Sequence, residues 1–167
     1  EEGIKQSVEF FHQATEVDPD YAAAYGGLAD SFILLAHKGL YRPHDIMPKA
    51  RAAALKAIEL DPQVPEAHMA LGFVRSVYDW DWEAAERHYW QALESSSYGN
   101  VEAQHWYATD YLLPLGRVDE ALQHIQHALF VDPLSHLINC SVGFVLIHRR
   151  EYEQAIEQFQ KGVCLDP

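Results

Sequence analysis

The stretch HLINCSVGFVLIHRREYEQAIEQFQKGVCLDP, from His136 to Pro167, decides the fold of this protein. It holds two apolar, periodic segments separated by a short polar turn. In the second segment Ala155, Phe159 and Gly162 recur at spacings of four and three residues, which places them on one helical face. The stretch ends on Asp-Pro, where proline cannot donate the next helical hydrogen bond and forces the preceding residue out of the α region. The sequence therefore predicts two antiparallel helices closed by a proline turn.

The same ending recurs along the chain with a measurable period. An aliphatic residue followed by Asp-Pro occurs four times, with the prolines at positions 19, 62, 133 and 167. The last spacing is a single unit of 34 residues, and the middle spacing of 71 is about two units. A degenerate junction is therefore expected near residue 97, where the polar segment ESSSYGN lies. The first spacing exceeds 34 by nine residues, which an inserted loop at 38–48 accommodates.

A second pattern agrees with this period. Before each junction a small residue, an apolar residue and another small residue share one helical face, which lets a neighbouring helix approach closely. Glycines 26 and 27 stand inside a helical segment and indicate a close backbone approach there, because glycine weakens a helix by about 1 kcal/mol. The pattern predicts a lone second helix at 3–17 and then four helix pairs: 21–37 with 47–60, 65–79 with 82–95, 101–113 with 117–131, and 135–148 with 151–165.

Helix–turn–helix units of 34 residues are the signature of the tetratricopeptide repeat, or TPR, and the sequence resembles this family over essentially its whole length. The unit at 136–167 carries the hallmark positions Gly143, Tyr152, Ala155 and Phe159, whereas the tryptophan of the family's first helix is missing. The resemblance implies an all-α, right-handed superhelical solenoid. The whole chain, 1–167, is then one array whose repeats after the lone helix span about 20–62, 63–97, 98–133 and 134–167.

A narrower resemblance points to a biological setting. The segments YAAAYGGLADSFILLA, PKARAAALKAIELDP and YDWDWEAAERHYWQALE look like the repeat region of bacterial regulators. In those proteins the repeats accompany a winged-helix, nucleotide cyclase or kinase domain. This resemblance implies a protein-interaction module of a larger regulatory protein.

Composition limits the kinds of partner. The 167 residues carry a net charge of −13, which argues against nucleic acid and against an anionic membrane surface as direct partners. The start of the chain has no signal-peptide pattern and no initiator methionine, so we expect a segment of a longer protein. Two cysteines without ligand spacing favour a reducing compartment, and hence the cytoplasm.

No residue pattern indicates catalysis, a cofactor or a metal. Glycine-rich phosphate loops, nucleophile elbows and His-Glu-x-x-His motifs are absent from the sequence. Glu120, His124 and His127 have a spacing that could bind zinc, but their slots normally face solvent, so we interpret them as surface residues. His68 and His105 fill the degenerate tryptophan slots and are expected to pack in partly buried positions. The prediction is a non-catalytic protein.

The family resemblance implies a concave groove, lined by the first helix of each unit, that binds extended peptides. Chaperone-binding members hold a terminal carboxylate there with Lys, Asn and Arg, and none of these occupies the equivalent slots in this sequence. The predicted partner is a protein or peptide with apolar anchors and basic residues between them. The alternative is that these side chains only pack between helices. The predicted groove residues are Asp30, Glu66, Met69, Phe73, Trp106, Asp110, Cys140 and Phe144.

An alternative function is self-association into a homo-oligomer. Trp80, Trp90 and Phe130 occupy slots that usually carry turn or polar residues, and exposed apolar surface of this kind often marks an association site. At the end of the predicted array, Ile156 and Val163 also lack the helix that a following unit would supply. We therefore expect the chain to associate end to end or through the Trp90 and Phe130 flank.

Overall fold

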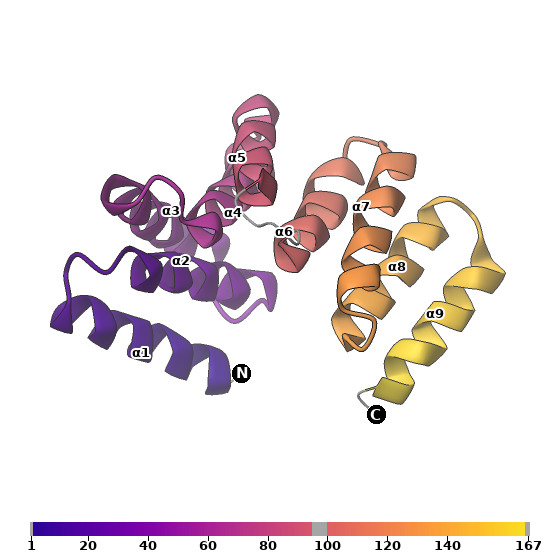
Figure 1. The fold of residues 1–167 in the computed structure, drawn as a ribbon, viewed down its shortest axis with the longest axis horizontal. Helices are drawn as coiled ribbons and strands as arrows, with labels where there is room; N and C mark the ends of the chain where they lie inside the picture. Colours follow the sequence, from indigo (N-terminus) through magenta and orange to yellow (C-terminus); the bar gives the residue numbers. More distant parts are fainter. Residues whose placement is uncertain (1, 95–99, 166–167) are drawn as a thin grey trace. The chain divides into compact units, whose positions relative to one another are not determined.

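The computed structural model describes residues 2–94 and 100–165. Over these residues the chain forms nine α-helices and two short π-helical segments, and it contains no strand. The all-α prediction is confirmed for this described part. The chain divides into two compact units, residues 1–96 and 97–167, each of which has its own core (Figure 1). Most of the predicted junction ESSSYGN lies outside the described residues.

Unit 1 is built from five α-helices and one π segment that pack side by side. Small residues allow the close contacts that the sequence predicted. The Phe11 ring lies so close to Gly27 that a Cβ there would come within 2.4 Å of it, and Tyr89 packs against Gly72 in the same way. Helix α2 contacts α1, α3 and α4, and α4 contacts α3 and α5. The elements are α1 (Glu2–Val17), α2 (Ala22–His37), α3 (Pro43–Leu60), α4 (Pro65–Phe73), η1 (Val74–Asp79) and α5 (Trp82–Glu94).

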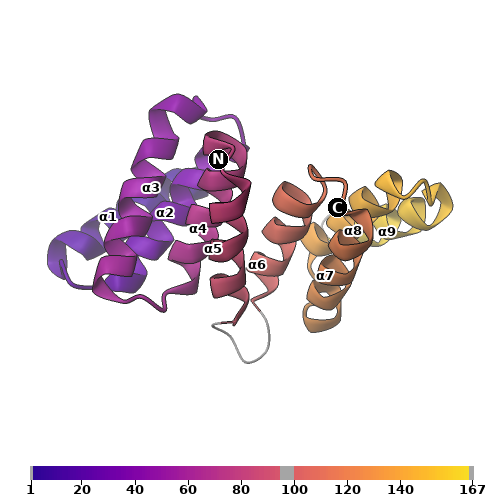
Figure 2. The same ribbon diagram turned by 90° about the horizontal axis from the view of Figure 1, so that it is seen from above.

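Unit 2 repeats this packing with four α-helices and a second π segment. Helix α8 contacts both α7 and α9 (Figure 2). The ring of Phe159 on α9 lies 3.0 Å from the Cβ position of Gly143 on α8, so the family's hallmark glycine allows this close approach. The elements are α6 (Val101–Trp106), η2 (Tyr107–Leu112), α7 (Val118–Val131), α8 (His136–His148) and α9 (Tyr152–Leu165).

The expected inserted loop at 38–48 is shorter in the structure. Helix α3 begins at Pro43 and includes Pro48, so only residues 38–42 form the connection. Pro43 stands in the first turn, where its missing N–H costs nothing, and Arg42 has the extended backbone that precedes proline. Arg42 Nε also donates to Asp45 Oδ2 over 2.8 Å. The turn residues that suggested a loop therefore start a helix.

The turn between the two helices of each pair uses a left-handed backbone. The residues with positive φ are Gly39, Trp80, Gly116 and Arg150. Glycine adopts this conformation without strain, whereas a bulky side chain does so at a cost of about 1 to 2 kcal/mol. The turn between η1 and α5 therefore presents a tryptophan where the turn between η2 and α7 uses glycine.

Candidate functional site

Helix α8 carries a stripe of apolar side chains on its outer surface. Ser135 fixes the start of the helix, because its Oγ accepts the backbone N–H of Ile138 over 3.3 Å. The inward face of the helix is core. On the outward face Leu137, Phe144 and Ile147 are 51%, 48% and 41% exposed. Their spacing of seven and three residues places them on one side of the helix. We call these three residues the α8 stripe.

Two further side chains border the α8 stripe. Cys140 is half-buried and packs against Gly162 of α9, where an added Cβ would come within 2.6 Å of its sulfur. His148 donates from Nδ1 to the Phe144 carbonyl over 2.9 Å, and its ring meets the Phe144 ring edge-on at 4.8 Å. The exposed Phe144 ring therefore packs against an exposed histidine at the end of the helix.

In unit 1 the predicted groove residues lie in a different environment. Met69 and Phe73 are completely buried in α4, and the Phe73 ring packs against His37 of α2 at 6.3 Å. Asp30 and Glu66 are half-buried on α2 and α4. A buried side chain offers no surface to a partner. Met69 and Phe73 therefore belong to the core of this structure, which does not fit their predicted place in an open groove.

In unit 2 the remaining predicted groove residues also differ in how far they are exposed to solvent. Trp106 is buried, so it does not serve as an exposed aromatic anchor either. Asp110 is half-buried and accepts the Thr109 hydroxyl over 2.5 Å. Phe144 is the predicted aromatic residue that presents its side chain to solvent. The sequence pattern could not distinguish these cases, since core and groove positions of a first helix are both apolar.

The three predicted self-association residues are exposed. The exposed fractions are 70% for Trp80, 47% for Trp90 and 85% for Phe130. Trp80 has the left-handed backbone described above, with φ of 60°, and its ring meets the Trp82 ring edge-on at 5.7 Å. Trp80 and Trp90 belong to unit 1 and Phe130 to unit 2.

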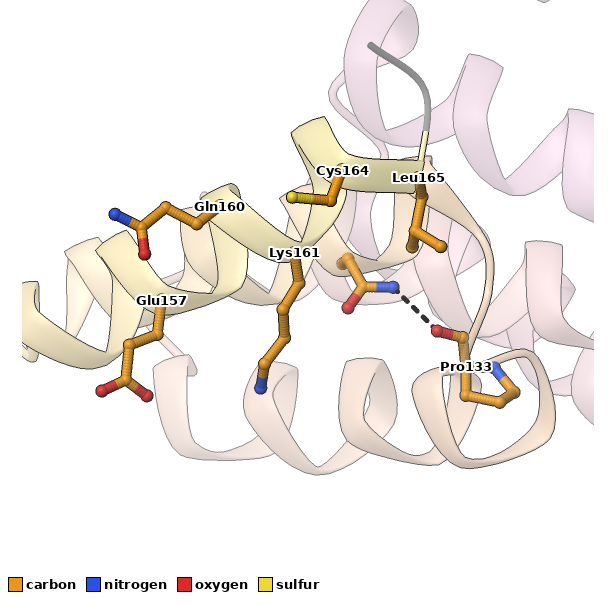
Figure 3. A pocket seen from close by; sticks show the side chains of 7 residues that line it. Pro133, Glu157, Gln160, Lys161, Cys164 and Leu165 are labelled. Atoms are coloured by element: carbon orange, nitrogen blue, oxygen red, sulfur yellow. Dashed lines mark hydrogen bonds between the residues drawn. The ribbon is translucent and has the colours of Figure 1, made fainter.

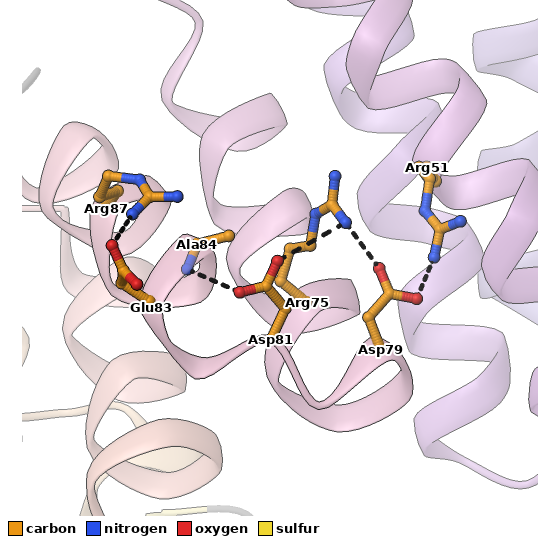
Figure 4. A network of polar contacts seen from close by, with 7 residues as sticks. All are labelled: Arg51, Arg75, Asp79, Asp81, Glu83, Ala84 and Arg87. Carbon is orange, nitrogen blue, oxygen red and sulfur yellow. Dashed lines mark hydrogen bonds and ion pairs between the residues drawn. The ribbon is translucent and has the colours of Figure 1, made fainter.

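A network of charged residues holds the turn that carries Trp80 (Figure 4). Asp79 accepts Arg51 of α3, and it also accepts Arg75 Nη1 over 3.2 Å. Asp81 Oδ1 accepts the N–H of Ala84 over 3.1 Å and so caps the start of α5. These bonds join α3, η1 and α5, and hydrogen bonds to charged groups are among the stronger ones in proteins. The network gives the turn a fixed shape despite its left-handed tryptophan.

The histidines pack against neighbouring helices. His68 is buried, and its Nδ1 lies 3.2 Å from Nδ1 of the half-buried His88. Burial, together with the proximity of His68, Arg75 and Arg87, lowers the pKa of His88 from 6.5 to about 4. His124 is half-buried rather than a solvated surface residue, because its ring packs on Tyr107 at 4.9 Å. Burial lowers the pKa of His124 as well.

Within residues 2–94 and 100–165, no group of three or more His, Cys, Asp and Glu side chains has an arrangement that could hold a metal ion. In these same ranges no helix combines the length and the apolar character that crossing a bilayer requires.

Helix α9 borders two surface hollows. One has a volume of about 560 Å³ and lies between α9 and the turn at Pro133, with Glu157, Lys161 and Cys164 among its lining (Figure 3). Asn139 also lines this hollow, and its amide donates to the Pro133 carbonyl over 3.1 Å. The other hollow has a volume of about 520 Å³ and an apolar lining of Ile156, Phe159, Gln160, Val163 and Cys164.

Comparison with known proteins gives relatives by sequence and by structure. No family model matches this chain. The transcriptional regulator HilA of Salmonella typhimurium is 28% identical over 130 residues, which cover 78% of this chain and 23% of HilA. The chain thus spans about a quarter of the length of the curated relatives that it matches.

Two solved structures show the fold. The human IFIT1 dimer with m7Gppp-AAAA has a TM-score of 0.82 at 21% identity and covers 100% of this chain and 40% of the IFIT1 chain. YrrB, a TPR protein with an unusual peptide-binding site, has a TM-score of 0.61 at 20% identity and covers 99% of this chain and 79% of YrrB. The chain has the tetratricopeptide-repeat fold.

Proposed function

We propose that this tetratricopeptide-repeat chain is a non-catalytic binding module that holds a peptide or partner domain on the α8 stripe. The observation that carries the proposal is the exposure of Leu137, Phe144 and Ile147 together on one face of a helix whose other face is core. Grouped apolar side chains on a surface often mark an interaction site, and aromatic residues dominate interface energies. Phe144 is the central anchor.

Charge defines the remaining chemistry of the proposed partner. The chain carries a net charge of −13, so a segment with Lys or Arg between its apolar side chains is attracted to it. Asp110, half-buried in unit 2, is the groove carboxylate assigned to such a cation. The proposed ligand is therefore a segment that alternates apolar and basic residues.

The similarity to HilA supports a regulatory setting for this module. HilA is a transcriptional regulator, and the matching part of it is 130 residues long. We propose that the chain is the interaction module of a larger bacterial regulatory protein in the cytoplasm. YrrB is a TPR protein with a peptide-binding site, which supports peptide binding as the activity.

A peptide selection on the purified full chain tests this proposal. Displayed random peptides that bind are expected to be enriched in apolar residues separated by Lys or Arg. A selected peptide should bind Phe144→Ala about tenfold more weakly, as expected for an interface anchor. Leu115→Ala removes an apolar side chain of similar exposure (40%) outside the stripe and serves as the control. Equal loss of affinity in both variants, or none in either, contradicts the proposed site.

A second candidate function is self-association through Trp80, Trp90 and Phe130. Their exposure supports it, as does the structural similarity to IFIT1, which was solved as a dimer. Light scattering over a hundredfold range of concentration measures the association of the chain. Replacement of Trp90 and Phe130 by serine should then abolish the rise in mass, and a constant monomer mass in the unchanged chain excludes this candidate.

A further inference from the structure

The turn between η1 and α5 places a tryptophan where the backbone conformation favours glycine. Within residues 2–94 and 100–165, four residues have a positive φ: Gly39, Trp80, Gly116 and Arg150. Trp80 is the one apolar side chain among them, and it is 70% exposed. Burial of the ring therefore does not compensate for the strained backbone. Backbone strain that a folded protein retains is often connected with a function.

Backbone and side-chain bonds together hold this turn in place. The N–H groups of Trp80 and Asp81 both donate to the carbonyl of Arg75, the second of them over 2.9 Å. The Arg75 guanidinium in turn donates to Asp79 (Figure 4). The Trp80 ring is thus presented on a preformed support, and a ligand does not have to order the turn when it binds.

The exposed indole of Trp80 is paired with a second indole. Its ring centroid lies 5.7 Å from that of the half-buried Trp82, and the two ring planes are inclined at 77°. Two nearly perpendicular rings offer an incoming side chain one face to stack on and a second ring beside it. Tryptophan is the aromatic side chain that attracts cations most strongly. The planar guanidinium of arginine stacks on such a face and directs its N–H groups sideways.

Asp81, between the two tryptophans, supplies a carboxylate at the same turn. Its side chain is 47% exposed, and its Oδ2 lies 3.9 Å from Arg75 Nη1, which is longer than a hydrogen bond. Oδ1 accepts the N–H of Ala84. A carboxylate has about four acceptor positions. Oδ2 can therefore accept an N–H from a further guanidinium.

The arginines of the chain that lie near this turn are already engaged. Asp79 accepts both Arg51 and Arg75, and Glu83 accepts Arg87 over 2.7 Å. The chain as a whole carries a net charge of −13. An incoming cation is therefore attracted to the chain, and the local arginines are balanced by their own carboxylates.

We infer that Trp80, Trp82 and Asp81 form a binding site for an arginine side chain of a partner protein. The guanidinium stacks on the Trp80 ring with Trp82 beside it, and one of its N–H groups donates to Asp81 Oδ2. Small-molecule sites enclose most of their ligand, so this open corner suits a side chain that a protein carries. The site lies in unit 1 and does not depend on the function proposed for the α8 stripe in unit 2.

The test follows the indole N–H signals of the full chain by NMR, each assigned by replacing one tryptophan at a time. The probe is N-acetylargininamide, and the four tryptophans are Trp80, Trp82, Trp90 and Trp106. We expect saturable shifts of the Trp80 and Trp82 signals with a Kd on the order of 10 mM. The signals of Trp90 and of the buried Trp106 should not move. Shifts of all four signals, or of none, overturn the inference.

Two further probes identify the chemistry that is bound. N-acetylcitrullinamide has nearly the shape of the arginine probe without its charge, and it should bind at least about fivefold more weakly. Equal affinity for the two probes overturns the assignment of a cation. N-acetylleucinamide that shifts the Trp80 and Trp82 signals as strongly as the arginine probe makes an apolar segment the occupant, and this also overturns it.

Trp80→Gly separates binding from folding. Glycine adopts this φ without strain, so the variant should unfold at an equal or higher urea concentration while the probe no longer shifts the Trp82 signal. Asp81→Asn can still cap α5 and should weaken binding about two- to fivefold. A loss of stability in Trp80→Gly gives the tryptophan a role in folding and overturns the inference, as does a variant that still binds the probe.

Controls separate this site from the two functions proposed above. Phe144→Ala in the α8 stripe should leave the affinity for the arginine probe unchanged. A dimer of the chain that Trp80→Gly dissociates and the arginine probe does not displace makes a second copy the occupant of the corner, and this overturns the inference.

Discussion

The paired imidazoles of His68 and His88 make the stability of unit 1 sensitive to acid. A carbonyl oxygen only accepts, so the His68 nitrogen that lies 2.8 Å from the Pro62 carbonyl, Nε2, carries its proton. Nδ1 of the neutral His68 ring must then accept, and Nδ1–H of His88 donates to it over 3.2 Å. When both rings are neutral, this geometry fixes the tautomer of each.

The perturbation is a fall in pH. The pKa of His88 drops from 6.5 in the unfolded chain to about 4 in the folded chain, chiefly through burial. Between these two values the unfolded state binds a proton that the folded state does not bind. The free energy of unfolding is therefore unaffected by His88 above pH 6.5 and decreases progressively as the pH falls from 6.5 to about 4. A fully buried group would lose about 1.4 kcal/mol per pH unit in this window. Because His88 is only half-buried, solvent screening reduces the effect, and we expect a total of about 1 to 2 kcal/mol.

Urea unfolding followed by tryptophan fluorescence measures this loss, since Trp80, Trp82 and Trp90 report on unit 1. The comparison is between the unchanged chain and His88→Gln at pH 7.5 and pH 4.5, because glutamine can still donate to His68 but does not titrate. Carboxylates also titrate in this range, but they contribute equally to the pH dependence of both proteins. Subtracting one free energy of unfolding from the other therefore cancels their contribution. His127→Gln, at an exposed histidine, is the matched control. Equal pH dependence in the unchanged chain and in His88→Gln refutes the reasoning.

Other predictions concern the core and the turns, and urea unfolding measures each of them. Phe73→Ala should lower the free energy of unfolding by about 3 to 5 kcal/mol, because the side chain is buried. Phe144→Ala should lower it by less than about 1 kcal/mol, because that side chain is half-exposed. Similar losses in the two variants would contradict this difference in burial. Gly116→Ala should cost about 1 kcal/mol because φ is +73° there, and a neutral result would argue against the left-handed turn. Gly72→Ala should cost about 1 to 3 kcal/mol, since the new Cβ meets the buried Tyr89 ring at 3.0 Å, unless that ring can move away.

The repeat pattern predicted most of the fold because its signals are local. Proline turns and the small–apolar–small trios depend on neighbouring residues in one helix, and the predicted pair at 135–148 with 151–165 agrees with α8 and α9 within a residue. The start of α3 was missed since the helix begins at a proline and contains another. The π segments η1 and η2 were also missed, because they extend α4 and α6 without changing the apolar pattern.

The candidate site was less predictable because it depends on contacts between helices. The register placed Phe73 and Phe144 in equivalent slots of their first helices. In the structure Phe73 is buried and Phe144 is half-exposed. Exposure at such a slot depends on the size of the side chains and on which helices lie beside it, and neither is a property of one segment. The exposure of Trp80 was predictable, since it lies in a turn; its left-handed backbone was not.

Phe144 differs from its equivalent in unit 1 in a way that bears on its proposed role. Phe73 occupies the same slot of its first helix and is core, whereas the Phe144 side chain is 48% exposed. The repeat itself therefore offers no model for what covers Phe144. The partner of the α8 stripe must be found by selection rather than derived from the packing of the helices.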